Sequence, residues 1–187
     1  MLFRSRAHMI EKIRQVTYAE AFKKIYGEKS LDNVDVAFTH VGHALQHYQL
    51  EDDEFFPFDS KYDLYLAGKV ELSPAEMRGL KLFNDKKRAN CAACHPSTKD
   101  EHGGAPLFTD FTYDALGLPR NEAIAANINK SYFDLGLCTS GRESRASKVS
   151  ECGKFKVPTL RNVATRKVFF HNGQIKSLQE AVAFYIR

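Results

Sequence analysis

Apolar residues recur at helical spacing through the first third of the chain. Between residues 7 and 25 they form one stripe that includes Ile10, Ile13, Phe22 and Ile25. This spacing predicts one amphipathic helix that ends at Gly27. A second helix is predicted over residues 32–48, where Val34, Val36, Ala37, Val41, Ala44, Leu45 and Tyr48 recur. The stretch 50–58, acidic and then aromatic, is predicted to connect this helix to the rest of the chain.

Two serine caps predict the starts of further helices. Ser73 is followed by proline and, three positions on, by glutamate, which is a capping box with proline at the first helical position. We expect that helix to run toward Asn84. Ser177 opens a second capping box and predicts a last helix that continues to Arg187. Residues 102–156 are rich in Gly, Pro, Asn and Asp, which is typical of irregular chain, so the sequence predicts helices and loops with little strand.

Composition narrows the class of protein only moderately. The chain has 187 residues, 43% of them hydrophobic, which is enough for one or two compact domains. No apolar run is long enough to suggest a membrane span. The net charge of +4 is mild, and basic and aromatic residues are not interleaved as they are on nucleic-acid surfaces. We therefore expect no nucleic acid among the partners.

The segment Cys91-Ala92-Ala93-Cys94-His95 carries the strongest chemical signal. C-x-x-C-H is the attachment sequence of a c-type haem: two thioethers hold the porphyrin and the histidine reaches the iron. A thioredoxin-like C-x-x-C would need βαβ alternation, and a structural zinc site would need a second close pair of ligands. Neither is visible in the sequence, so haem c attachment is favoured over both.

The other two cysteines and the motif together point to the periplasm. Cys138 and Cys152 are an even pair, and a disulfide between them would contribute about 3 kcal/mol. Haem c attachment is itself periplasmic in Gram-negative bacteria. The N-terminus shows no signal-peptide h-region or cleavage site, so we expect a removed signal or a piece of a longer protein. Three basic residues precede the motif and either dock an acidic redox partner or form a solvated loop: Lys86, Lys87 and Arg88.

The sixth iron ligand is not expected to be methionine. The three methionines are Met1, Met9 and Met77, and none follows the C-x-x-C-H motif. Met77 is interpreted as a core residue, because methionine fills irregular gaps in cores. The His/Met pair that raises the reduction potential is therefore not predicted. The downstream candidates are His102, His171, Tyr113, Tyr132 and Tyr185.

Several motifs occur in the order found in one protein family. They are Leu80-x-Leu82-Phe83, Asn90 to His95, Phe108-Thr109-Asp110, Asp134-Leu135-Gly136, Phe155 to Val163, and Phe170-His171-Asn172-Gly173. From about Tyr62 onward the chain resembles the C-terminal haem domain of bacterial di-haem cytochrome c peroxidases and MauG-type enzymes. The resemblance implies an all-α, cytochrome c-like fold with long irregular loops. It makes residues 61–187 the C-terminal cytochrome c domain. It makes residues 1–60 a helical remnant of the peroxidatic domain without its own haem motif.

The same resemblance implies an unusual distal ligand. The peroxidases place a methionine fourteen positions after the F-H-x-G histidine, whereas MauG has a tyrosine there. Counting from His171 leads to Tyr185. We therefore predict His95 and Tyr185 as the axial pair, with a buried structural tyrosine as the alternative.

Other site residues follow from the resemblance with alternatives left open. His171 and Phe170 are expected beside the haem, or His171 is a hydrogen-bonded packing histidine. Arg161 is expected to pair with a haem propionate, or to face solvent. The family also binds calcium through backbone carbonyls, which correspond here to Arg166 and Val168. These depart from the usual threonine and proline, and no side-chain ligand is identifiable.

A histidine stripe lies on the second predicted helix. His40, His43 and His47 share one face, which suits either a metal or haem site or an exposed polar stripe. No carboxylate is evident from the spacing to orient these rings, so the polar stripe is favoured.

The resemblance predicts the haem c domain of a MauG-like di-haem peroxidase or oxidase. It would relay electrons to, or share oxidising equivalents with, a peroxide-activating haem on the rest of its own di-haem enzyme. A redox partner protein or a protein substrate would be the further partner. The alternatives are a mono-haem electron-transfer cytochrome, a di-haem peroxidase that reduces hydrogen peroxide, and a haem-free structural or zinc module.

Overall fold

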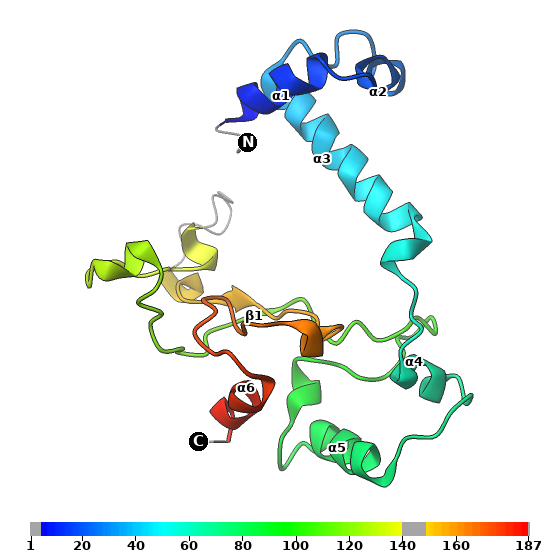
Figure 1. Cartoon of the computed structure of the whole chain (residues 1–187), viewed down its shortest axis with the longest axis vertical. Coiled ribbons are helices and arrows are strands. Elements are labelled where there is room, and N and C mark those ends of the chain that lie inside the picture. Colours follow the sequence, from blue (N-terminus) through cyan, green and yellow to red (C-terminus); the bar gives the residue numbers. More distant parts are fainter. Residues whose placement is uncertain (1–4, 140–148, 187) are drawn as a thin grey trace. The chain divides into compact units, whose positions relative to one another are not determined.

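The computed structural model describes residues 5–139 and 149–186 and divides into two compact units, Met1–Phe58 and Asp59–Arg187. The division lies beside the domain boundary predicted after residue 60. Apart from one short β-ribbon the regular structure is helical, which confirms the all-α, cytochrome c-like fold class (Figure 1). No helix in the described part of the chain is both long and apolar enough to cross a membrane.

The first unit contains α1 (Arg6–Arg14), α2 (Ala19–Tyr26) and α3 (Val34–Glu51). The prediction of a single helix over residues 7–25 is wrong, because the chain turns between α1 and α2. Three hydrogen bonds from an N–H to the carbonyl three residues earlier tighten the chain there, and Val16-Thr17-Tyr18 are poor helix formers. The side chain of Arg14 also donates to the carbonyl of Leu31 at 2.5 and 3.2 Å, which draws the end of α1 toward the start of α3.

A small apolar core joins these three helices. Its buried members are Ile10, Ala19, Leu31 and Ala37. The second predicted helix is present as α3, and Asn33 caps it by accepting hydrogen bonds from the backbone N–H groups of Asp35 and Val36. The stretch after α3 is a connection, as predicted, and contains the short 3-10 turn η1 (Asp53–Phe55).

The second unit starts with α4 (Lys61–Leu66) and α5 (Pro74–Asn84). The capping box at Ser73 forms with both of its hydrogen bonds, as the sequence predicts. An equivalent box between Ser60 and Asp63 starts α4, which the sequence analysis did not identify. The last helix, α6 (Leu178–Phe184), begins after Ser177 as predicted. It ends at Phe184 rather than continuing, and Arg187 lies outside the described residues.

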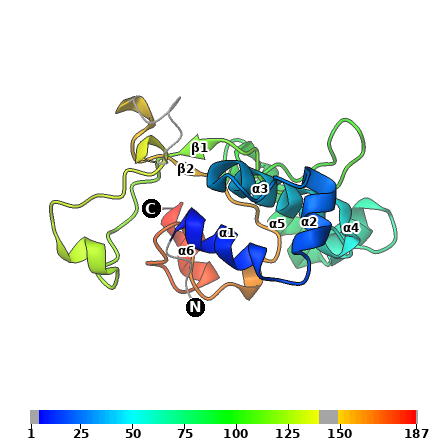
Figure 2. The same ribbon diagram turned by 90° about the horizontal axis from the view of Figure 1, so that it is seen from above.

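The long middle region is irregular, as expected, with one antiparallel ribbon. β1 (Tyr113–Asp114) pairs with β2 (Phe155–Lys156), and the two lie side by side in Figure 2. Short 3-10 turns lie in this region and on either side of it: η2 (Cys91–Ala93), η3 (Ala125–Ile128), η4 (Leu137–Thr139), η5 (Val149–Glu151) and η6 (Val163–Thr165).

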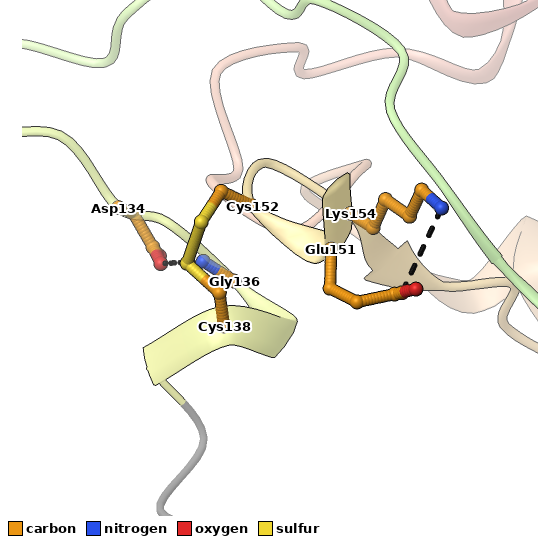
Figure 3. Close-up of a disulfide and its surroundings, with 6 residues drawn as sticks. All are labelled: Asp134, Gly136, Cys138, Glu151, Cys152 and Lys154. Carbon is orange, nitrogen blue, oxygen red and sulfur yellow. Dashed lines mark hydrogen bonds and ion pairs between the residues drawn. A yellow bond between two sulfur atoms is a disulfide. The ribbon is translucent and has the colours of Figure 1, made fainter. Parts of the chain in front are cut away.

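A disulfide joins Cys138, in η4, to Cys152, which directly follows η5, with 4.8 Å between the Cα atoms (Figure 3). Gly136 lies beside it at φ +55°, and a Cβ atom there would collide with the carbonyl oxygen of Lys154. The N–H of Leu137 donates to that same carbonyl at 2.9 Å. The close approach of the two chain segments therefore requires glycine at this position.

Candidate cofactor-attachment site

The C-x-x-C-H motif folds into a single tight turn. Asn90 adopts the left-handed conformation at φ +51°, and η2 follows it directly. The N–H groups of Cys94 and His95 both donate to the carbonyl of Cys91, at 3.3 and 2.9 Å. This turn keeps both thiols and the imidazole within one local structure.

The residues after the turn are anchored to two helices. Ser97 is 2% exposed, and its hydroxyl donates to the side-chain oxygen of Asn84 at the end of α5, at 2.7 Å. The Tyr62 hydroxyl on α4 donates to the Ser97 carbonyl at 2.8 Å. The position of the motif is therefore set by side chains of α4 and α5.

His95 is oriented by a backbone carbonyl. Its Nδ1 lies 2.7 Å from the carbonyl oxygen of Phe108, and because a carbonyl only accepts, Nδ1 must carry the hydrogen. In neutral His95 the Nε2 lone pair is then available to a metal ion. This is the tautomer that a proximal iron ligand requires.

The thiols complete a donor set that fits haem c. Cys91 and Cys94 are partly buried and not joined to each other. Burial raises the pKa of both thiols, and for Cys94 the nearby carboxylates of Asp110 and Asp114 add to the effect. The motif therefore offers two protonated thiols for thioether formation together with one oriented imidazole, as covalent haem attachment requires.

The loop that carries the Phe108 carbonyl is joined to the segment following β2. Thr109, which is buried, donates through its hydroxyl to the carbonyl of Val157 at 2.7 Å. The Thr159 hydroxyl donates to the carbonyl of Leu107 at 2.6 Å. The orientation of His95 thus depends on a loop held by residues about 50 positions further along the chain than the loop itself.

Arg161 belongs to the same network. Its guanidinium makes a bidentate ion pair with Asp63, at 2.8 and 2.9 Å, and its Nε donates to the carbonyl of Pro106 at 2.9 Å. Hydrogen bonding from Arg161, opposed by burial and aided by Ser60, lowers the pKa of Asp63 to about 2. Arg161 is 21% exposed at its side chain, so the solvent-facing alternative is wrong. Its contact with a haem propionate stays a prediction.

Tyr185 lies at the C-cap of α6. Its ring packs against Phe170 and Phe184, with ring centroids 5.9 and 5.5 Å away. Desolvation at the hydroxyl raises the pKa of Tyr185, and the acidic groups of Cys94, Cys91 and Asp114 add to it. The residue as a whole is 60% exposed, and its coordination of a haem iron stays a prediction.

Phe170, which the sequence predicts to line the haem pocket, packs against Tyr185. It takes φ +60°, a strained value for a residue with a bulky side chain, and its ring also contacts Phe184 at 5.2 Å between centroids. The strained backbone and the two ring contacts direct Phe170 against the end of α6. It therefore supports the position of Tyr185.

His171 stacks flat on Phe155 of β2, with 3.4 Å between ring centroids and 5° between ring planes. Burial lowers the pKa of His171, opposed by Asp134, so the neutral ring is favoured. The stacking supports a packing role for this histidine. A contact with haem stays a prediction.

The two positions predicted to bind calcium lie at the surface. Arg166 and Val168 are exposed, and the backbone N–H of Arg166 closes a turn to the carbonyl of Val163 at 3.1 Å. Within residues 5–139 and 149–186, no group of three or more His, Cys, Asp or Glu side chains is arranged to hold a metal ion. The calcium site therefore stays a prediction from the resemblance.

The sequence analysis missed two residues of the site. Asp63 and Phe108 orient Arg161 and His95, yet each acts on a residue far away in the chain. The Ser60-x-x-Asp63 spacing is a capping-box signal that would have placed Asp63 at a helix start. No sequence signal indicates its partnership with Arg161.

Comparisons with known proteins agree with this geometry. MauG of Paracoccus denitrificans is 35% identical over an alignment of 189 positions that covers 99% of this chain and 47% of that protein. Cytochrome c551 peroxidase of Pseudomonas aeruginosa is 29% identical over 170 residues, which is 89% of this chain and 41% of that protein. The chain thus spans a little under half the length of these curated relatives. No protein-family model matches it.

A solved structure is similar over nearly the whole chain. The diheme peroxidase BthA of Burkholderia thailandensis superimposes with a TM-score of 0.85 at 37% identity, covering 98% of this chain and 45% of BthA. Because both sequence and fold agree over almost all of its residues, the chain belongs to the family of MauG and di-haem cytochrome c peroxidases.

Proposed function

We propose that this chain is the haem c-binding part of a periplasmic di-haem peroxidase or oxidase of the MauG type. The observation that carries the proposal is the single turn that holds two free thiols and an imidazole oriented by the Phe108 carbonyl. Tyr185, at the end of α6, is the proposed second iron ligand. Haem c bound there would supply one-electron chemistry at its iron. The peroxide-activating haem would belong to the rest of the enzyme.

Each residue of the site has a separate task in this proposal. Cys91 and Cys94 anchor the porphyrin by thioether bonds. His95 presents Nε2, because Phe108 holds the Nδ1 hydrogen. Tyr185 would provide the second axial ligand, as a phenolate, since a bound cation favours the anionic form of its ligand. Anionic oxygen favours the ferric state, so this site would have a low reduction potential.

The basic residues before the motif suit the docking of a partner protein. Lys86, Lys87 and Arg88 are all exposed, on the turn between α5 and the thiols. An acidic redox protein or protein substrate would be attracted to them, and salt would weaken that attraction.

A di-haem peroxidase that reduces hydrogen peroxide is the second candidate, favoured by the similarity to cytochrome c551 peroxidase. We favour the MauG type because a tyrosine, Tyr185, stands fourteen positions after His171, whereas Met77 is on α5 before the motif. A mono-haem electron carrier has less support, because a tyrosinate ligand does not suit a high potential.

The test is a comparison of iron ligation in matched variants of the haem-loaded chain. We would measure haem per chain by pyridine haemochrome, then record ferric absorption spectra and reduction potentials for wild type, Tyr185→Phe, Tyr185→Met and Tyr132→Phe. Tyr132 is an exposed tyrosine of the same unit and serves as the control. We expect a changed ferric spectrum in Tyr185→Phe, a raised potential in Tyr185→Met and no change in Tyr132→Phe.

Two outcomes would contradict the proposal. A Tyr185→Phe spectrum identical to wild type would remove Tyr185 from the iron. Absence of covalent haem, after expression with the c-type maturation machinery, would remove the cofactor itself.

A further inference from the structure

Two histidines on α3 converge on one point, far along the chain from the C-x-x-C-H motif. His43 and His47 are four residues apart and therefore neighbours on the helix surface. Their Nε2 atoms lie 3.1 Å apart, whereas their ring centroids are 4.4 Å apart. The rings thus approach each other at their Nε2 ends. Both residues are exposed, so this point is open to solvent.

The outer nitrogen of each ring has a partner of its own. Nδ1 of His47 lies 2.7 Å from the carboxylate of Glu51, so it carries a hydrogen and donates it. Nδ1 of His43 lies 3.2 Å from the hydroxyl of Tyr26 on α2. Glu51 is the orienting carboxylate that the sequence analysis did not expect. Carboxylate and hydroxyl partners on the outer nitrogens are the arrangement found behind metal-bound histidines.

Without a metal ion, the hydrogen bonds have a single consistent direction. Tyr26 donates to Nδ1 of His43, Nε2 of His43 donates to Nε2 of His47, and Nδ1 of His47 donates to Glu51. A metal ion between the rings needs both Nε2 lone pairs. This requires only that His43 transfer its proton from Nε2 to Nδ1, while the Tyr26 hydroxyl turns from donor to acceptor.

The distance between the rings suits a tetrahedral ion. Metal–nitrogen bonds of about 2.0–2.1 Å place two ligands about 3.3 Å apart in tetrahedral geometry. The two Nε2 atoms are already within a few tenths of an ångström of that separation. Because the ligands are imidazoles, late first-row ions such as Zn²⁺, Cu²⁺ and Ni²⁺ are favoured over Ca²⁺ and Mg²⁺.

We propose that His43 and His47 form a binding site for a divalent late transition-metal ion, with Glu51 and Tyr26 orienting the two rings. Water would fill the other coordination positions, since no third His, Cys, Asp or Glu joins the pair within the described residues. His40 does not contribute: its ring stacks on Tyr26 with centroids 4.6 Å apart, and its Nδ1 is buried. The site is independent of the haem proposal, because it uses only residues of the first unit.

The test is calorimetric titration of Zn²⁺ into the tag-free, haem-loaded chain. We expect saturable binding near one ion per chain, lost in His43→Ala and in His47→Ala. His102→Ala is the matched control. His102 is also an exposed histidine beside a glutamate, with its Nε2 3.5 Å from Oε1 of Glu101, but it is not paired with a second imidazole among the described residues. Glu51→Gln should weaken binding about 10- to 100-fold by removing the charge behind His47.

Circular dichroism would verify that each variant keeps its helices. Absence of saturable binding by wild type would overturn the proposal. So would unchanged affinity in both His→Ala variants, or an equal loss in His102→Ala, which would assign the ion to other histidines.

Discussion

The buried ion pair between Asp63 and Arg161 should supply a pH-dependent part of the stability. The pKa of Asp63 falls from its ordinary 3.8 to about 2. Because one pKa unit is worth about 1.4 kcal/mol, this depression corresponds to about 2 kcal/mol. The side chain of Asp63 is 7% exposed, so water does little to screen its interaction with Arg161. Because the folded pKa is depressed, this stability is present above about pH 4 and is lost as the pH falls toward 2.

Three variants test this value by urea denaturation of the haem-loaded chain at pH 7. Arg161→Met leaves a buried, unpaired carboxylate and should reduce the free energy of unfolding by about 3–5 kcal/mol. Asp63→Asn should also destabilise, and should flatten the loss of stability measured between pH 5 and pH 2. The double variant should lose less than the sum of the two single losses, because the interaction can be removed only once.

A surface pair of similar character provides the control. Glu76 also has a pKa of about 2, caused first by the hydrogen bond from Lys61, but both side chains are largely exposed. Lys61→Met should therefore change stability far less than Arg161→Met, since solvent screens the pair. Additive losses for Asp63→Asn and Arg161→Met, within about 0.5 kcal/mol, would refute the coupling.

Three further changes should alter stability by separate mechanisms, each measurable by urea denaturation. Gly136→Ala should destabilise, because the backbone is left-handed and the new Cβ meets the Lys154 carbonyl; Gly117→Ala, with φ +63° and open space, should cost less. Replacing Cys138 and Cys152 by serine should lower the free energy of unfolding by about 3 kcal/mol. If loss of the disulfide is the cause, the reduced wild type and the variant should be equally stable. Ser73→Ala should cost about 1 kcal/mol by removing the cap of α5, whereas Ser73→Asp should retain most of the stability.

Local features were predictable because their determinants lie within a few residues of one another. The caps at Ser73 and Ser177 place the starts of α5 and α6 correctly, since a serine hydroxyl reaches an N–H only three positions away. The single helix predicted over residues 7–25 failed because the apolar periodicity was given more weight than the poor helix formers Val16-Thr17-Tyr18, and because a distant contact also acts there. Its break involves Arg14 and the carbonyl of Leu31, seventeen positions apart in the sequence, and helical periodicity carries no information on such a contact.

By itself the sequence determined the chemistry of the site: two thiols, an adjacent imidazole, an even cysteine pair elsewhere, and no methionine after the motif. Only the tertiary structure decided how those groups are held. Arg161 pairs with Asp63, 98 positions away, and His95 takes its tautomer from the carbonyl of Phe108. A backbone carbonyl is present at every residue, and an arginine can pair with any carboxylate within reach. The partner is therefore chosen by loop geometry, which forms only when the distant segments pack together.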